Sequence, residues 1–384
     1  MLRILHIIPA VAPRYGGPSE MVFGICRHLD RRGHQTTILT SDADGSGTLP
    51  VRYGETVEFR GVSTRFFPRR WSESFKIAPG MATWLREHIG EFDIVHLHAV
   101  FSWSTMVGGK ICLQRNVPYV VRPLGSLDPW SLSQRRWLKR ILMEVGVRHI
   151  LHHATAIHYT SELERQAAES SLGLKKGRVI ANAVTMPDET RSPPLQADSA
   201  FDKYLLYLGR LHPKKKLEWV ISSFAEVAET SFHLVIAGDG DAGYRESLQR
   251  LAEGCGAANR IHFEGWVSGD RKETLLQGCE AFLLVSENEN FGISAVEAMV
   301  RGRPVVVNEG VNLYPEIRRH GAGWVVASRK TALTSTLAEV IRNRDERVVR
   351  GQKARNLAER LYGWNVVTDA LEALYLDCLS IELV

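Results

Sequence analysis

Short apolar runs alternate with amphipathic, helix-like stretches along nearly the whole chain. This alternation predicts parallel strands joined by helices that cover both faces of a sheet, so the expected fold class is α/β with doubly wound sheets. Helices are expected to begin near Ser19, Pro79, Ser104, Ser131 and Ser161. Strands are predicted at 3–8, 35–40, 94–98, 119–122, 156–159 and 179–181, and again at 204–208, 232–237, 260–263, 281–285, 305–307 and 323–326.

The alternation stops once, between the two halves of the chain. The stretch 186–202 contains Pro187, Pro193 and Pro194 without an apolar period, which is typical of a linker. A chain of 384 residues also suits two domains better than a single core. Ligands of such sheets bind beyond the carboxyl ends of the strands, so motifs at strand ends carry the functional information. We predict one Rossmann-like domain over 1–186, a linker over 187–202 and a second Rossmann-like domain over 203–364.

Composition excludes several classes of protein. The longest apolar runs, such as 281–285, are far shorter than the roughly 20 residues of a transmembrane helix, so none is expected. The first residues read as a strand and not as a signal peptide, because His6 and Pro9 interrupt their apolar run. The five cysteines are scattered without a CxxC pair, which indicates neither a disulfide framework nor a zinc site. A cytoplasmic protein is expected, and its net charge of +5 does not by itself indicate nucleic acid as a partner.

The most informative motif follows the predicted strand 281–285. Glu289 is expected in the loop after this strand and Glu297 in the helix that the loop leads into. Free amides at the helix N-terminus would bind an anion, and the two carboxylates beside it would accept hydrogen bonds from the hydroxyls of a ribose or a hexose. The predicted ligand-binding residues of the loop are Asn290, Phe291, Gly292 and Ile293.

A basic turn follows the first strand of the second half. Gly209 and Arg210 are followed by three consecutive lysines, 214–216. Arginine offers a bidentate fork and lysine a mobile point charge, and together these suit the oxygens of a diphosphate. The alternative for such a run is a solvated basic turn.

Together these two motifs resemble those of the retaining glycosyltransferase family 4, in which the second domain carries a Gly-Arg-(x4)-Lys turn and a Glu-(x7)-Glu motif. Here they read Gly209-Arg210…Lys215 and Glu289…Glu297. The resemblance covers nearly the whole chain. Further matching motifs, in the expected order, are Gly16-Gly17, His96-Leu97-His98, Leu127-Asp128-Pro129-Trp130, Ala237-Gly238-Asp239-Gly240 and Glu297-Ala298-Met299.

The resemblance implies a GT-B fold, in which two Rossmann-like domains face each other across a cleft and a C-terminal helix, here 365–384, joins the first domain. It implies a retaining hexosyltransferase that needs neither metal nor another cofactor. The donor would be a UDP- or GDP-linked sugar, and the acceptor a glycan, with a lipid-linked precursor of a surface polysaccharide favoured.

The resemblance also assigns roles to residues. Arg210 and Lys215 would bind the donor diphosphate and stabilise its leaving charge. Glu297 would hold the ribose, and Glu289 the hydroxyls of the transferred sugar. Contacts to the donor would be completed by Gly16, Gly17, Gly209 and Gly240.

The sequence departs from the family pattern in two places. Many members have a histidine where this chain has Leu124, so either His98 or Arg122 would contact the transferred sugar instead, or each would be an orienting or core residue. The second departure is Lys216, where a small residue such as glycine is common.

Other patterns leave alternatives open. Residues 238–243 fit GxGxxG, which would indicate an NAD-dependent oxidoreductase, and a non-catalytic nucleotide-sugar-binding subunit is a third possibility. Asp42-Ala43-Asp44 and Asp239-Gly240-Asp241 both read DxD, but neither is expected to bind a metal, and His96 is expected to be structural.

The stretch 131–142 combines four cations with an apolar stripe. A helix of this kind either lies on an anionic membrane surface or packs its stripe inside the first domain. A second basic, aromatic patch at 65–71 favours the membrane interpretation, in which the protein is peripheral on the inner face of the plasma membrane.

Overall fold

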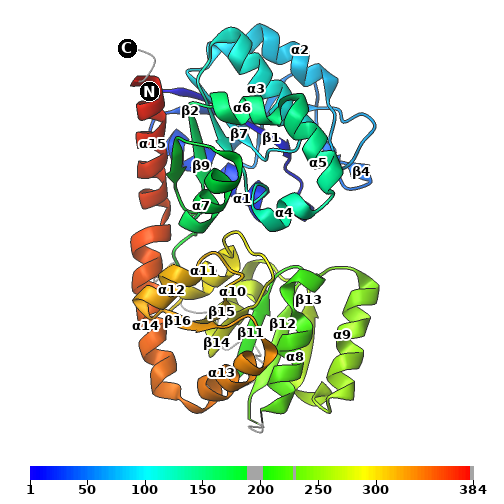
Figure 1. Cartoon of the computed structure of the whole chain (residues 1–384), viewed down its shortest axis with the longest axis vertical. Coiled ribbons are helices and arrows are strands. Elements are labelled where there is room, and N and C mark those ends of the chain that lie inside the picture. Colours follow the sequence, from blue (N-terminus) through cyan, green and yellow to red (C-terminus); the bar gives the residue numbers. More distant parts are fainter. Residues whose placement is uncertain (188–201, 228–230, 381–384) are drawn as a thin grey trace. The chain divides into compact units, whose positions relative to one another are not determined.

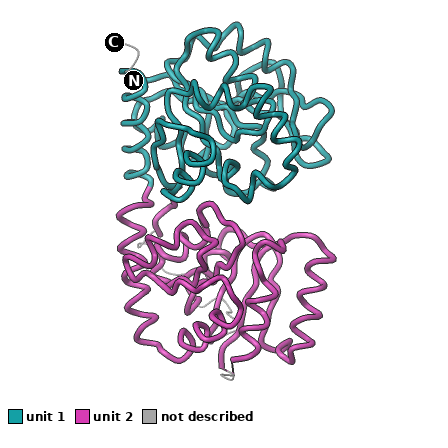
Figure 2. The backbone as a smooth tube through the Cα atoms, viewed as in Figure 1, with its two compact units in different colours: residues 1–183, 364–384 teal, residues 184–363 magenta. Residues whose placement is uncertain are grey.

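The computed structural model describes residues 1–187, 202–227 and 231–380, which form two compact units (Figure 2). Unit 1 comprises residues 1–183 and 364–384, and unit 2 comprises residues 184–363. Nearly all of the predicted linker, 187–202, lies outside the described residues. Helix α15, Trp364–Ser380, belongs to unit 1, so the chain ends in the unit in which it began (Figure 1).

Unit 1 is built on an eight-stranded sheet with the order β10-β9-β8-β7-β1-β2-β6-β5. Its strand pairs are parallel except for β5 and β6, which pair antiparallel. The strands are β1 Arg3–Ala10, β2 Gln35–Ser41, β5 Thr56–Phe59, β6 Val62–Phe67, β7 Ile94–His98, β8 Tyr119–Arg122, β9 Ala156–Tyr159 and β10 Gly177–Val179, and β3 Ala43–Asp44 pairs separately with β4 Gly47–Thr48.

The hairpin of β5 and β6 was not predicted from the sequence. Residues 65–71 were interpreted as a basic, aromatic surface patch, and this is wrong for Phe66 and Phe67, which are buried in β6. The strand alternates buried Val62 and Thr64 with more exposed polar positions, because one face packs on the core while the other meets solvent. Arg70 and Trp71 are exposed, so the basic, aromatic surface is confined to the end of this stretch.

Helices cover both faces of this sheet, and local signals set their ends. Ser102 caps α3, Trp103–Arg115, by accepting a hydrogen bond from the Thr105 N–H, and the left-handed Asn116 follows its last residue. Ser161 caps α7, Glu162–Leu172, in the same way. The other helices of the unit are α1 Gly17–Arg31, α2 Pro79–His88, α4 Pro129–Ser133, α5 Arg136–Leu142, α6 Arg148–His153 and α15.

The basic stretch 131–142 is not one helix. Helix α4 ends at Ser133, and α5 starts only after Gln134 in an extended conformation and Arg135 in a left-handed one. After α5 the chain passes through a π turn at Met143–Val147, where the non-helical Gly146 (φ 171°, ψ -25°) introduces a kink before α6.

Unit 2 is built on a six-stranded parallel sheet with the order β13-β12-β11-β14-β15-β16. The strands are β11 Tyr204–Leu208, β12 His233–Ala237, β13 Ile261–Gly265, β14 Ala281–Leu284, β15 Val305–Asn308 and β16 Gly323–Val326. The helices are α8 Leu217–Glu226, α9 Ala242–Gly254, α10 Gly269–Gly278, α11 Ile293–Met299, α12 Tyr314–His320, α13 Lys330–Arg342 and α14 Arg344–Tyr362. In the described part of the chain, no helix has both the length and the apolar character needed to cross a bilayer.

Each sheet has one point at which its strand order reverses direction. In unit 1 the reversal lies between β1 and β7, and in unit 2 between β11 and β14. The loops after two such strands diverge to opposite sides, which opens a crevice at the carboxyl edge where ligands of doubly wound sheets bind. These two switch points are where functional residues are expected.

Candidate functional site

At the switch point of unit 2, an ion pair joins the loops that follow β11 and β14. Lys215 pairs with Glu289, and the next lysine, Lys216, pairs with Glu287. Lys215 is only 8% exposed although it is a lysine in a connecting turn. The structure therefore brings together the two motifs that the sequence singled out.

Backbone contacts fix the position of Lys215. The turn Pro213–Lys215 is a 3-10 helix whose preceding residue, His212, accepts a hydrogen bond from the Lys214 N–H. The Lys214 carbonyl accepts the Glu287 N–H at 2.7 Å and the Ser286 hydroxyl at 3.1 Å. The basic turn and the loop after β14 consequently form one rigid assembly and not a solvated surface turn.

Glu289 is held from three sides. Its backbone N–H donates to the Gly310 carbonyl at 2.7 Å, its carbonyl accepts the Asn312 N–H at 2.9 Å, and the Phe291 N–H hydrogen-bonds its carboxylate. Burial alone would raise the pKa of Glu289, but the ammonium groups of Lys215 and Lys214 outweigh it and lower that pKa below its ordinary value. The carboxylate is ionised at neutral pH and can accept hydrogen bonds.

Gly292 and Glu297 continue the site into α11. Gly292 adopts a left-handed conformation with φ 84°, and a Cβ there would lie 2.7 Å from Leu284, so a glycine is required at this turn. Asn290 and Ile293 are half-buried in the same loop, whereas the Phe291 ring is buried against Tyr362.

Glu297 accepts a hydrogen bond from Lys272 of α10 at 2.7 Å. Sequence reasoning missed this lysine because α10 carries no motif. The only sequence feature at Lys272 is the run of charged residues in which it stands, and such a run does not indicate a contact with Glu297.

Gly209, Gly238 and Gly240 are explained by backbone packing. A Cβ on Gly238 would overlap the Gly209 carbonyl, and a Cβ on Gly240 would overlap the Leu211 carbonyl. The Leu211 N–H donates to the Asp239 carbonyl at 2.9 Å, which holds the two loops together. The GxGxxG pattern at 238–243 thus meets a steric need of the loops after β11 and β12. Arg210, on the same loop, is exposed.

At the switch point of unit 1, Gly16 lies between β1 and α1, and Gly17 is the first residue of α1. Gly16 has φ 69°, which the turn into the helix requires, and Pro18 stabilises the first helical turn. The residue before Gly16, Tyr15, donates a hydrogen bond to Glu73 at 2.6 Å and accepts one from the Gly45 N–H at 3.0 Å. Burial and the Glu73 carboxylate raise the pKa of Tyr15 to about 12.

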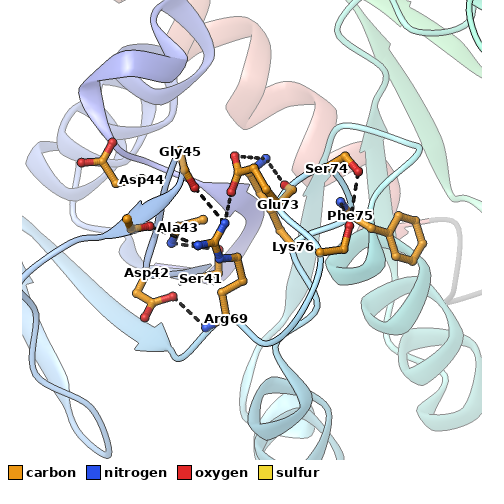
Figure 3. Close-up of polar contacts among 12 residues, drawn as sticks. Ser41, Asp42, Ala43, Asp44, Gly45, Arg69, Glu73, Ser74, Phe75 and Lys76 are labelled. Carbon is orange, nitrogen blue, oxygen red and sulfur yellow. Dashed lines mark hydrogen bonds and ion pairs between the residues drawn. The ribbon is translucent and has the colours of Figure 1, made fainter.

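Glu73 is the centre of this network (Figure 3). It pairs with Arg69, whose backbone N–H donates to Asp42 at 2.7 Å, and with Lys76 at 3.3 Å. Asp42 and Asp44 form one of the two DxD matches. Asp42 therefore joins the loops after β2 and β6, and Asp44 pairs at 3.4 Å with Arg14 in the loop after β1. The network braces the loop that carries Gly16.

His98 and Arg122 lie in the interior of unit 1, each 1% exposed. His98 Nε2 lies 3.0 Å from His6 Nδ1, and the His98 ring stacks on that of His96 with centroids 4.4 Å apart. Arg122 donates a hydrogen bond to Asn182. Both residues therefore lie in the core of unit 1, but His98 Nδ1 and the Arg122 Nε and Nη1 have no hydrogen-bond partner among the described residues, so contact with a sugar stays a prediction.

Burial keeps the histidines of this cluster neutral. It lowers the pKa of His6 to about 3, and it lowers the pKa of His96, His98 and His158 as well, with the nearby Arg122 guanidinium adding to each effect. His96 hydrogen-bonds Tyr375 of α15 at 2.8 Å, so the cluster also fastens the C-terminal helix. In the sequence, this cluster is visible only as histidines inside the apolar strands β1, β7 and β9.

Within the described ranges, ring nitrogens of His6, His96 and His98 lie within 4.8 Å of one another, close enough to share a metal ion. The two rings of β7 are two residues apart and so share a face. The Arg122 cation beside the group opposes a second positive charge.

Both departures from the family pattern fall at left-handed backbone. Leu124 has φ 56° and Lys216 has φ 49°. The left-handed backbone explains why glycine is common at the position of Lys216, because glycine adopts this conformation without steric cost. Lys216 retains the conformation while pairing with Glu287 and lying 5.3 Å from the Trp219 ring centre.

Two family models match the chain. The model described as Glycosyl transferase 4-like domain matches residues 16–183, and the one described as Glycosyl transferases group 1 matches residues 195–357.

Similar proteins were found along the full length of the chain. It is 25% identical to the phosphatidyl-myo-inositol mannosyltransferase of Mycobacterium leprae, over 97% of this chain and 96% of that protein. It is 23% identical to the GDP-mannose:cellobiosyl-diphosphopolyprenol alpha-mannosyltransferase of Komagataeibacter xylinus, over 99% and 94%. The crystal structure of Anabaena HepE in complex with UDP-glucose superimposes with a TM-score of 0.78 at 20% identity, covering 97% of this chain and 99% of that one.

The match to a glycosyltransferase family overturns the interpretation of the chain as an oxidoreductase. The close backbone contacts of Gly238 and Gly240 account for the GxGxxG pattern without a bound dinucleotide. The two models between them account for both units, and the structural neighbours share the arrangement of two parallel-sheet domains. The chain belongs to the group 1 glycosyltransferases, enzymes of the GT-B fold.

Proposed function

We propose that this glycosyltransferase is a retaining hexosyltransferase that transfers a hexose from a UDP- or GDP-linked donor to a lipid-linked glycan at the cytoplasmic face of a membrane. The observation that carries the proposal is the Lys215–Glu289 pair at the switch point of unit 2. It places a cation for a diphosphate beside an ionised acceptor for hydroxyl groups, and a nucleotide sugar presents both.

The roles follow from charge and position. Lys215 stabilises the negative charge that develops on the leaving diphosphate. The exposed Arg210 binds the same diphosphate. Glu289 accepts hydrogen bonds from the hexose, and Glu297 accepts them from the ribose. The donor diphosphate competes with Glu289 for the Lys215 ammonium, so binding loosens the ion pair and frees the carboxylate for the sugar.

Retention follows if the acceptor oxygen attacks on the face that the diphosphate leaves. The acceptor oxygen then bonds to the anomeric carbon as the bond to the phosphate oxygen breaks, and that phosphate oxygen takes the acceptor proton. No protein base is needed, which suits an interior where His98 is buried and neutral. Fixed cations replace the metal of other transferases, and we propose that none is required.

Support for donor and acceptor classes comes from related proteins. Two relatives are named for mannosyl transfer, one to phosphatidyl-myo-inositol and one to a glycan on diphosphopolyprenol, and Anabaena HepE was crystallised with UDP-glucose. A nucleotide-linked hexose appears in the names with GDP-mannose and UDP-glucose, and a lipid-borne acceptor appears in the names of the two mannosyltransferases.

The test is release of nucleoside diphosphate from UDP-glucose and from GDP-mannose, with and without membrane extracts as a source of acceptor. We expect one donor to be turned over by the wild type and by Lys353→Ala, an exposed lysine of α14, but not by Glu289→Gln. Equal turnover by Glu289→Gln would overturn the assignment. Donor binding without transfer or hydrolysis would instead identify a non-catalytic nucleotide-sugar-binding subunit.

A further inference from the structure

Helix α5 and the first residues of the π turn that follows it expose a row of apolar side chains. Trp137, Ile141 and Val145 follow one another at intervals of four residues, which places them on one face of the helix. They are 71%, 50% and 70% exposed. A group of large, exposed apolar side chains of this kind marks a site of interaction with a protein or a membrane.

A second row beside it is basic. Arg136 and Arg140 each precede a residue of the apolar row by one position, and Arg148 follows after the kink at Gly146. Glu144 is the only acid in this row, and it pairs with Arg148 at 3.5 Å. The side chains of Arg136 and Arg140 have no polar partner among the described residues, so their charges are available to an outside anion.

The basic row opens onto a groove of about 510 Å³. Leu132 of α4, Met143 and Leu172 of α7 contribute apolar walls, and Lys139 adds a further cation. Lys139 is itself held in place, because it donates to the Ser131 carbonyl and lies 5.1 Å from the Phe101 ring centre. The groove is therefore lined by apolar side chains together with the cations of the basic row.

We propose that this face of unit 1, formed by residues 136–148 and the groove beside them, docks on a bilayer that contains anionic phospholipids. The basic row and Lys139 bind lipid phosphates, while Trp137, Ile141 and Val145 enter the interfacial layer. The charge of the face selects the anionic bilayer over a protein partner, since one paired acid stands against four cations. The proposal deepens the proposed function, because a lipid-linked acceptor resides in such a membrane.

The break between α4 and α5 supports this arrangement. If residues 131–142 formed one uninterrupted helix, its 3.6-residue period would fix the direction of Leu132 relative to the apolar row. The left-handed Arg135 lets α4 run in a different direction from α5 (Figure 1). Leu132 of α4 lines the groove, while Trp137 of α5 is exposed.

The experiment is flotation of the full chain with vesicles of phosphatidylcholine alone and of an equal mixture of phosphatidylcholine and phosphatidylglycerol. We expect binding to the mixed vesicles at low salt, a steep loss of binding as salt rises, and little binding to phosphatidylcholine. Each basic residue near an anionic surface contributes about fivefold in partitioning, so Arg136→Glu/Arg140→Glu should weaken binding by at least tenfold. Trp137→Ser/Ile141→Ser should also weaken it and abolish any blue shift of tryptophan fluorescence caused by the vesicles.

The matched control is Arg86→Glu/Lys110→Glu, which makes the same change in net charge at two exposed residues of unit 1. It should bind like the wild type. Equal binding to both kinds of vesicle, or equal loss in the control, would overturn the proposal, and so would the absence of flotation.

Hydrolysis of the nucleotide-sugar donor in solution separates this proposal from the function. The surface variants should hydrolyse donor as the wild type does. If the wild type hydrolyses donor but does not float, the proposal of a docking surface is wrong and the proposed function stands. If it floats but does not turn over donor, the docking surface stands and the proposed function is wrong.

Discussion

The two switch points share a sheet topology but are built from opposite chemistry. In unit 2, charged side chains meet at the carboxyl edge, with Lys215 paired to Glu289 on loops after β11 and β14. In unit 1, the corresponding strands β1 and β7 carry His6 and His98, which are neutral and buried. Parallel strands alone do not decide where ligands are held; the polarity and exposure of the side chains at the strand ends do.

The comparison also separates two ways of fixing a strand end. Unit 2 uses backbone hydrogen bonds and close contacts between loops, as at Gly238 and Gly240. Unit 1 uses a chain of side-chain contacts that reaches Tyr375 in the C-terminal helix. The first arrangement leaves charged groups at the strand ends, whereas the second leaves His6 Nε2 and His98 Nδ1 buried without a hydrogen-bond partner among the described residues.

The largest expected effect concerns acid. The pKa of His6 is lowered to about 3, and those of His96, His98 and His158 lie below the ordinary value of 6.5. Below pH 6.5 the unfolded chain therefore binds more protons than the folded one, and the free energy of unfolding falls as pH falls. From pH 7.5 to 5.5 we expect a loss of about 1.4 kcal/mol for each histidine that stays neutral, or roughly 4–6 kcal/mol in all.

Chemical denaturation at several pH values, followed by hydrogen exchange in each unit, measures this loss. The amides of β1, β7 and β9 should lose protection at pH 5.5 while those of β11 and β14 retain it. Equal losses in the two sheets would remove the contrast between the units.

The next effect is catalytic. Lys215→Ala removes the cation nearest Glu289, and we expect kcat for the productive donor to fall by about 10²–10³, the size of losing one preorganised donor of positive charge. Lys353→Ala on α14 serves as the control in the same kinetic assay. Turnover within a factor of two of the wild type would show that the Lys215 ammonium does not meet the leaving group.

A smaller effect separates packing from ligand binding in unit 2. Gly238→Ala would push a Cβ into the Gly209 carbonyl, and we expect a loss of about 2–4 kcal/mol in the free energy of unfolding. Gly243→Ala, within the same GxGxxG pattern but in α9, should be neutral or slightly stabilising, since its Cβ meets only Asp241 at 3.3 Å. Thermal denaturation of both variants measures this difference; similar losses would mean that the contact between Gly238 and the Gly209 carbonyl does not distinguish the two glycines.

The smallest effect is at Lys216. Alanine and glycine both lose the Glu287 pair and the Trp219 contact, but only glycine relieves the positive φ. Lys216→Gly should exceed Lys216→Ala in free energy of unfolding by about 1 kcal/mol. A more stable alanine variant would mean that the turn is not held in the left-handed conformation.

Much of the fold could be read from the sequence because its strands are buried on both faces. Strands such as β11 and β14 are continuous apolar runs, which a parallel sheet requires. Strand β6 was missed because one of its faces is exposed, so polar residues interrupt its apolar ones. The break at Arg135 was missed because a left-handed arginine has no signature in sequence.

The site was predictable only where a motif carried it. Lys215 and Glu289 belong to spaced patterns whose meaning lies in the loops of unit 2. Lys272, by contrast, reaches Glu297 across two helices, and no local pattern encodes such a contact. The burial of His98 and Arg122 depends on three neighbouring strands, which spacing along one strand does not disclose.

The central claim, that unit 2 holds a nucleotide-linked sugar, is tested most directly by a thermal-shift panel of UDP, GDP, ADP, their sugar conjugates and NAD on the wild type and Glu297→Ala. A ligand at about 100 times its Kd adds about 2.7 kcal/mol to the free energy of unfolding, a readily measured shift. We predict that one class of nucleoside diphosphate and its sugar conjugate stabilises the wild type and that Glu297→Ala loses this shift. Stabilisation by NAD alone, or a full shift in Glu297→Ala, would contradict the claim.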